Sequence, residues 1–230
     1  MTINAKKAQD LIKQLQENTK RVSPRGQGRT KQETEPWIAH RIISAMATSD
    51  LLEYPIELIF SDRPDLILKQ PNIQIGIEII ELIPPAYAHA VAIRNEHYSG
   101  ALVDRSLFGW GATFTSQQIH EYFQGNPNRL TGNGWEGDGV ELEWAKAVKK
   151  AVEHKVEKLN SSGFNVFPSN WLALYASSPG PELDHELGAS LVVFPLERAG
   201  LYSFERLLVL SGKNLIVFES SGNRILKVPL

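Results

Sequence analysis

The chain has 230 residues, of which 42% are hydrophobic and 22% are charged, and its formal net charge is -2 at pH 7. This composition is typical of a globular protein with a substantial core, and the near-balanced charge gives no global attraction to nucleic acid or to a membrane. The chain contains no Cys, which excludes disulfides, thiolate nucleophiles and Cys-ligated zinc. No segment is apolar for the length of a membrane span or a secretory signal, so we expect a cytoplasmic protein without a membrane partner.

The amino-terminal part of the chain is predicted to be peripheral. Residues 4–18 carry a narrow apolar stripe at helical spacing, and the next segment, "TKRVSPRGQGRTKQ", is rich in Gly, Pro, Ser and basic residues. This segment is either a solvated connector or a basic arm that contacts phosphate groups. In the second interpretation, the contacting side chains are Arg21, Arg25, Arg29 and Lys31. We therefore expect a helix with a basic linker over residues 1–32, followed by one larger domain over residues 33–230.

The larger domain is predicted to contain both helices and strands. Thr34 is a candidate N-cap of a helix that has Pro36 in its first turn, and residues 54–83 form two or three β-branched strands separated by turns. Helical patterns follow at 86–97, 115–124 and 140–160. The remaining segments alternate with period two and are predicted to be strands: "NWLALYA", "SLVVFPL", "FERLLVL", "NLIVFES" and "RILKV". Turns between the last three predict an antiparallel meander, and the order of elements favours an α/β or α+β sheet covered by helices.

Three acids lie inside the apolar stretch "RPDLILKQPNIQIGIEIIELI": Asp65, Glu78 and Glu81. Buried carboxylates are costly unless they are paired, protonated or bound to a metal. Strand alternation places Glu78 and Glu81 on opposite faces, whereas Asp65 on a neighbouring strand can share a face with Glu78. Two such carboxylates can bind one hard cation such as Mg²⁺. The alternative is that Asp65 lies in a turn and Glu78 on a solvated sheet face.

Two further charged residues interrupt apolar stripes on helices. At about 100° per residue, Lys155 falls in the middle of the stripe that contains Val148 and Val152. A lysine in this position either extends to solvent or meets a buried acid, and in the second case it is a candidate catalytic group. Glu35 prolongs the stripe of the helix near residue 40, and it is either a functional acid or a first-turn acid that interacts favourably with the helix dipole.

These residues resemble the motif of the PD-(D/E)xK nuclease superfamily, which is Pro-Asp, a strand, then Asp or Glu, any residue, and Lys. Asp65 after Pro64 and then Glu78 match the acidic positions, but Ile80 stands where the motif has its lysine. The similarity is to variants in which the lysine stands on a following helix, here Lys155. It covers roughly residues 35–175 and implies a restriction-endonuclease-like α/β core, with a central mixed sheet flanked by helices.

The resemblance also implies a function, a Mg²⁺-dependent nuclease that hydrolyses phosphodiester bonds, with DNA as the expected partner. Asp65 and Glu78 would hold Mg²⁺ or Mn²⁺ with the carbonyl of Ile79, and Lys155 would orient water or offset negative charge. Glu35 matches an additional acid that the family often carries on the helix before the sheet, where it would complete the surroundings of the metal. A homodimer is left open.

Two alternatives to the nuclease remain. The first is a catalytically inactive nuclease fold that binds nucleic acid or another protein, because Ile80 replaces the motif lysine. The second is a structural protein in which Asp65, Glu78 and Lys155 form a buried ion-paired cluster.

Overall fold

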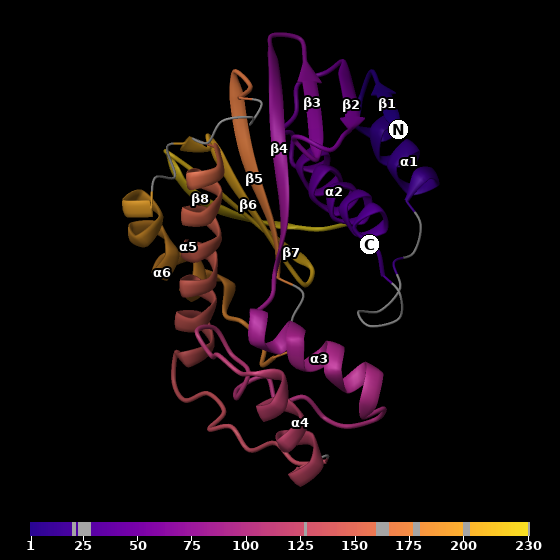
Figure 1. Ribbon diagram of the computed structural model, residues 1–230. Coiled ribbons are helices and arrows are strands. Elements are labelled where there is room, and N and C mark those ends of the chain that lie inside the picture. The colour runs from indigo at the N-terminus through magenta and orange to yellow at the C-terminus, as the bar shows by residue number, and fades with distance from the viewer. Residues whose placement is uncertain are drawn as a thin grey trace.

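The computed structural model describes residues 1–19, 22, 29–126, 128–159, 166–176, 180–199 and 203–229. These residues form an α/β fold, in which a mixed eight-stranded sheet is flanked by helices (Figure 1). The strands are β1 (Thr2–Ala5), β2 (Ile56–Phe60), β3 (Leu66–Gln70), β4 (Ile73–Leu82), β5 (Ser169–Ala176), β6 (Arg206–Ser211), β7 (Asn214–Glu219) and β8 (Gly222–Lys227). The helices are α1 (Ala8–Asn18), α2 (Lys31–Thr48), α3 (Pro85–His97), α4 (Ser116–Gly125), α5 (Gly139–Leu159) and α6 (His185–Ala199).

The strands lie side by side in the order in which they occur in the chain. β5 runs parallel to both β4 and β6, and every other neighbouring pair is antiparallel. A parallel neighbour requires a long crossover connection, and residues 83–168, with α3, α4 and α5, provide it between β4 and β5. The carboxyl ends of β4, β5 and β6 therefore meet at one edge of the sheet, the lower edge in Figure 1.

The two faces of the sheet are covered by different helices. Ile77 and Ile79 of β4 belong to a core with α1 and α2, whereas Leu82 of β4 and Leu172 of β5 belong to a core with α5 and α6. This division follows the alternation of side chains along each strand. Figure 1 shows the two helix layers on opposite sides of the sheet. A third cluster, around Phe108, joins α3 and α4 below the lower edge.

Much of the predicted secondary structure is confirmed. The strands expected within 54–83, the three helices of the long connection and the carboxyl-terminal meander are all present. The strand expected from "SLVVFPL" is wrong, because residues 190–196 lie inside α6. In that helix the amides of Glu186 and Leu187 both donate to the carboxylate of Asp184, which starts the helix ahead of the apolar run.

The start of α2 also differs from the expectation. The N-cap is Thr30, not Thr34, and Glu33 accepts a 3.0 Å hydrogen bond from the Thr30 amide in a capping box. Lys31 is therefore the first helical residue. The domain boundary expected after residue 32 falls inside this helix, and β1 pairs with β2 in the same sheet.

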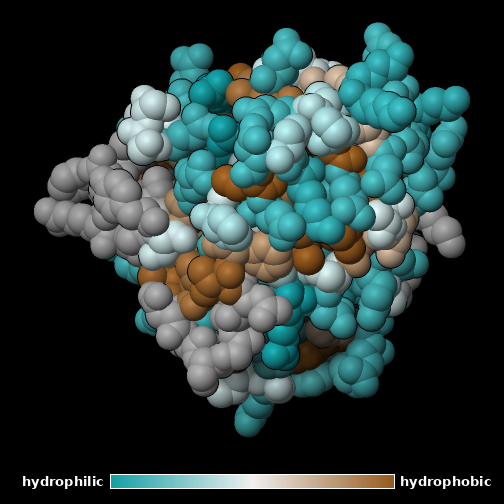
Figure 2. All heavy atoms as spheres, turned by 90° about the horizontal axis from the view of Figure 1, so that it is seen from above, coloured by the Kyte–Doolittle hydropathy of each residue, from teal (hydrophilic) through white to brown (hydrophobic). Residues whose placement is uncertain are grey.

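The end of the molecule opposite α3 and α4 is mainly hydrophilic, with smaller hydrophobic areas between the polar side chains (Figure 2). Among the described residues, no helix combines the length and the apolar character needed to cross a membrane.

Candidate functional site

A lysine on α5 contacts an acid on β4. The Nζ atom of Lys155 lies 2.6 Å from Oε2 of Glu78, and the two side chains are only 14% and 9% exposed. The contact forms because α5 packs on the face of β4 to which Glu78 belongs. Of the two interpretations of Lys155, the structure shows the one in which the lysine meets a buried acid. A solvated sheet face for Glu78 is wrong.

Asp65 lies beside the same strand. Leu66 pairs with Ile77, so the preceding residue, Asp65, enters the sheet at the level of Glu78. Its carboxylate accepts a 2.8 Å hydrogen bond from the Ile79 amide, and the residue is 5% exposed. Asp65 stands in the bend before β3, but it is buried rather than solvated. The backbone group of Ile79 that contacts this acid is its N–H, and metal ligation by its carbonyl stays a prediction.

Glu35 and Asp65 share one ammonium group. Nζ of Lys31 lies 2.9 Å from Oε1 of Glu35 and 3.1 Å from Oδ1 of Asp65. Lys31 and Glu35 are one turn apart on α2, whereas Asp65 comes from the chain before β3, so these contacts join the helix to the sheet. The two acids are largely buried, but the side chain of Lys31 is 68% exposed.

The charges in this region perturb one another. Burial raises the pKa of Glu35, the hydrogen bond from Lys31 opposes the rise, and the negative charge of Asp65 adds to it. The pKa of Lys31 is raised as well, chiefly by its hydrogen bond to Glu35 and also by Asp65, against the effect of burial. Lys31 is therefore held in its charged form by the two acids that surround it.

We call Glu35, Asp65, Glu78, Lys31 and Lys155 the acid cluster. Among the described residues, no three acidic or His side chains lie close enough together to hold a metal ion. Mg²⁺, however, is usually bound through one or two carboxylates, with waters and phosphate oxygens as its other ligands. Glu35 and Asp65 already surround one cationic group, the amine of Lys31. Glu35 and Asp65 are therefore the two residues of the acid cluster that could hold one Mg²⁺ or Mn²⁺ ion.

The basic arm contacts the protein itself where the structure describes it. Arg29 forms a largely buried ion pair with Glu81. The pairing of β4 with β5 runs without interruption from Ile75 to Leu82, so Glu81 faces away from Glu78 as alternation requires. Arg29 and Lys31 thus both bind acids of this chain, and Arg21 and Arg25 lie outside the described residues.

A glycine allows the chain to pack closely beside the acid cluster. A Cβ atom on Gly76 would lie 2.8 Å from Cδ2 of Phe167 and 3.2 Å from Cγ of Pro64. The absence of a side chain at Gly76 therefore lets the Pro64–Asp65 segment and the residues just before β5 pack closely against β4. Gly76 lies two positions before Glu78. The sequence analysis predicted neither this role of Gly76 nor the contacts of Lys31. The i, i+4 spacing of Lys31 and Glu35 is the sequence feature that could have predicted their ion pair.

No family model, curated protein or solved structure shows significant similarity to this chain. The class that the fold defines is an α/β protein with a mixed sheet flanked by helices.

Proposed function

We propose that the acid cluster is the active site of a Mg²⁺-dependent nuclease that hydrolyses phosphodiester bonds, with DNA as its substrate. The observation that carries the proposal is the buried contact of Lys155 with Glu78, beside Asp65 and Glu35, which share one cation. The cluster combines oxygen donors for a hard cation with a fixed ammonium group. A mixed sheet flanked by helices, with one acid on the helix before it, supports a restriction-endonuclease-like core.

Four residues of the cluster, Glu35, Asp65, Glu78 and Lys155, have a part in this chemistry. Asp65 and Glu35 would hold the metal, with Glu78 beside them, and Mg²⁺ would supply Lewis acidity and a bound water of lowered pKa. The amide of Ile79 fixes the carboxylate of Asp65. Lys155, held by Glu78, presents a positive charge that offsets the negative charge developing on the phosphate oxygens. The cytoplasmic location and the homodimer stay predictions.

The test is a cleavage assay with purified protein, Mg²⁺ or Mn²⁺, and single- and double-stranded DNA and RNA. We expect cleavage of DNA, and we expect Asp65→Asn and Lys155→Met each to lower its rate by about 100-fold or more. Lys149→Met is the matched control, because Lys149 lies on the same helix but is 42% exposed and pairs with Glu153. Intact substrates with the wild-type protein, or full activity in Lys155→Met, would contradict the proposal.

A second function, binding of nucleic acid without cleavage, is favoured by a separate observation. Every acid of the cluster is paired with a lysine, and Ile80 stands at the motif position that the resemblance assigns to lysine. For this function we expect salt-dependent retention of DNA with no cleavage under any metal. Retention that persists in Asp65→Asn while all substrates stay intact would favour binding over catalysis.

A further inference from the structure

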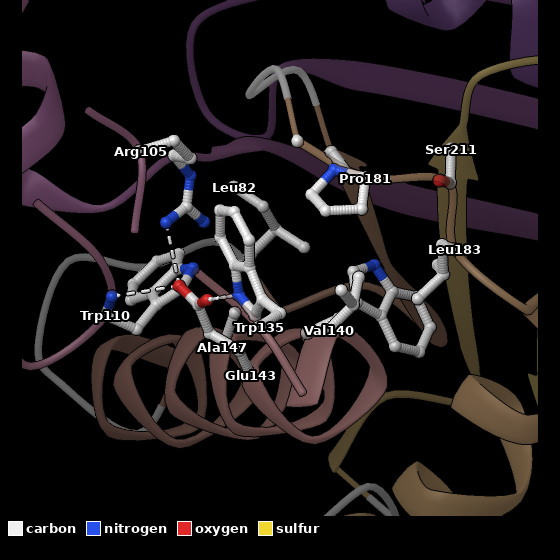
Figure 3. Close-up of a pocket in the computed structure, with 13 residues that line it drawn as sticks. Leu82, Arg105, Trp110, Trp135, Val140, Glu143, Ala147, Pro181, Leu183 and Ser211 are labelled. Atoms are coloured by element: carbon white, nitrogen blue, oxygen red, sulfur yellow. Dashed lines mark hydrogen bonds and ion pairs between the residues drawn. The ribbon is translucent and has the colours of Figure 1, made fainter. Parts of the chain in front are cut away.

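A pocket lies outside the acid cluster, at the edge where the parallel strands end (Figure 3). Its volume is about 110 Å³. Leu82, Ala176 and Ser211, the last residues of β4, β5 and β6, all line it. In open α/β sheets, ligands bind in the crevice outside the carboxyl ends of parallel strands. The pocket likewise lies outside the carboxyl ends of parallel strands, although the strand order does not reverse there.

The lining of the pocket is strongly aromatic. It includes Trp110, Trp135 and Trp144, three of the five tryptophans in the chain, and we call it the tryptophan pocket. Indole rings bind other planar rings by stacking. The Nε1 atom of Trp144 is buried and has no hydrogen-bond partner among the described residues. A buried N–H without a partner is costly, so an acceptor on a ligand that reaches this atom would offset that cost.

Glu143 fixes the other polar groups of the pocket. Its carboxylate accepts hydrogen bonds from Arg105 Nη1 at 2.8 Å, from Trp135 Nε1 at 2.7 Å and from the Trp110 amide at 3.1 Å. Figure 3 shows these three residues gathered around the carboxylate. The charge of Arg105 is thereby balanced inside the protein. The pocket thus offers aromatic surface and hydrogen-bond donors without a net charge, which suits a neutral ring better than a phosphate group.

The size of the pocket restricts the ring. A cavity of about 150 Å³ in a protein core accommodates benzene. At about 110 Å³, with an opening to solvent, the tryptophan pocket accepts one six-membered ring and is small for a fused two-ring system. Among nucleobases, this size favours a pyrimidine, whose carbonyl oxygen can accept from Trp144 Nε1.

The pocket lies on the face of the sheet that carries Glu78 and Lys155, two members of the acid cluster. Leu82 and Glu78 are four positions apart on β4, which corresponds to about 13 Å along a strand. Glu143 and Lys155 are twelve positions apart on α5, which corresponds to about 18 Å along a helix. A chain of nucleotides whose phosphate lies at Lys155 can therefore place a base of a nearby nucleotide in the pocket.

We propose that the tryptophan pocket binds a pyrimidine base, which stacks on its indole rings and accepts a hydrogen bond from Trp144 Nε1. The choice of a nucleobase among planar rings rests on the proposed function. The base comes from either of two sources, a bound single strand or a free nucleotide. Binding itself requires neither a metal nor Asp65, so it is measured apart from cleavage.

The experiment measures quenching of tryptophan fluorescence in the metal-free protein. The probes are thymidine monophosphate, adenosine monophosphate and a short single-stranded oligothymidylate. We expect saturable quenching by the thymidine probes and much weaker quenching by adenosine monophosphate. Trp135→Ala should weaken binding about tenfold, as expected for the loss of one stacking partner. Trp144→Phe, which keeps a ring but loses the N–H, should weaken binding about fivefold.

The matched control is Trp37→Phe, because Trp37 lies on the other face of the sheet, away from the tryptophan pocket. There its ring centroid is 5.2 Å from that of Tyr175. This variant should bind as the wild type does, and urea unfolding checks that each variant is folded. Quenching by the mononucleotide identifies a free nucleotide as sufficient, and quenching by the oligonucleotide alone identifies a base of a strand; both outcomes support the pocket.

Two results would overturn the inference. One is the absence of quenching by any thymidine probe, and the other is equal affinity in the wild type, Trp135→Ala and Trp144→Phe. If the protein binds the thymidine probes but cleaves no substrate, the proposed pyrimidine site is supported and the proposed nuclease function is contradicted. If the wild-type protein cleaves DNA but binds no thymidine probe, the nuclease function is supported and the pyrimidine site is contradicted.

Discussion

The ammonium group of Lys155 lies 2.6 Å from the carboxylate of Glu78, although 77 positions separate the two residues in the chain. Both side chains are largely withdrawn from water, so each is the principal counter-charge of the other. The contact joins α5 to β4 across the layer that also contains Leu172 and Val152. It therefore bears on stability as well as on the proposed chemistry.

Removal of one partner of this pair should destabilise the fold. Lys155→Met leaves the buried carboxylate of Glu78 without its partner, and we expect a loss of about 3 kcal/mol in the free energy of unfolding. The double variant Glu78→Leu/Lys155→Met should recover most of this loss, because no unpaired charge remains. Urea unfolding of the single variants, the double variant and Lys149→Met measures these differences. A Lys155→Met effect no larger than that of Lys149→Met would contradict the prediction.

Replacement of Lys31 should strengthen metal binding. The amine of Lys31 occupies the space between Glu35 and Asp65 and competes with any cation for their oxygens. Lys31→Met should therefore bind Mn²⁺ about tenfold more tightly above neutral pH, as measured by calorimetry. Lys13→Met is the control, since Lys13 forms an exposed i, i+4 pair with Glu17 on α1. Weaker binding of Mn²⁺ in Lys31→Met would show that Lys31 is not a competitor.

The stability of the fold should depend on pH through Glu35. Its pKa is raised by burial, so as pH rises the unfolded chain releases this proton first, and the native state is destabilised between the two pKa values. Because Lys31 opposes the rise, Lys31→Met should move the upper end of this window to higher pH. Urea unfolding over a series of pH values measures the slope. Glu35→Gln should lack it, and an unchanged slope in Glu35→Gln would contradict the assignment.

A methyl group at position 76 should disturb the acid cluster. Gly76→Ala places a Cβ atom against the ring of Phe167, and we expect a loss of about 1–3 kcal/mol in the free energy of unfolding. The double variant Gly76→Ala/Phe167→Ala should be less destabilised than the sum of the two single variants, because the contact is gone. Gly125→Ala at the end of α4 is the control, since its Cβ meets no atom within 4 Å. Strict additivity of the two changes would exclude a clash.

Asp104 should stabilise the loops that carry the tryptophan pocket. Its buried carboxylate accepts from the amides of Ser106, Leu107 and Gly132 and from the Ser106 hydroxyl. Burial alone would raise the pKa of Asp104. The hydrogen bonds lower it by more than burial raises it, so the pKa lies below the ordinary Asp value. Asp104→Asn should therefore cost about 2 kcal/mol at neutral pH. Because the folded-state pKa is depressed, this difference should shrink as pH falls through it, and a pH-independent difference would contradict the account.

Sequence patterns were sufficient for the residues whose surroundings are regular. Helical arithmetic alone placed Lys155 in the middle of an apolar stripe, because α5 is long and the stripe is continuous, but it left open whether the lysine reaches solvent or meets an acid. The alternation along β4 likewise separated Glu78 from Glu81, because the strand pairs without a bulge. In both cases, local geometry determines which way a side chain points.

Other features depend on contacts that no local pattern contains. The apolar run of α6 has the composition of a buried strand, and only the cap at Asp184 distinguishes it. β1 is a four-residue edge strand, too short for a periodic signal. The basic segment that contains Lys31 is interpreted from sequence either as a solvated connector or as an arm that contacts phosphate, whereas the cap at Thr30 makes Lys31 helical and its amine contacts Asp65.

The order of the strands has a consequence for how the protein is made. Since neighbours in the sheet are also neighbours in the chain, β1 to β4 can pair while the rest is still being synthesised. Asp65 and Glu78 can then be in place before Lys155 has left the ribosome, whereas β5 can join the sheet only once the connection of residues 83–168 has been made. Glu78 therefore has no lysine partner until α5 has been synthesised, and β5, α6 and β6 to β8 follow after that.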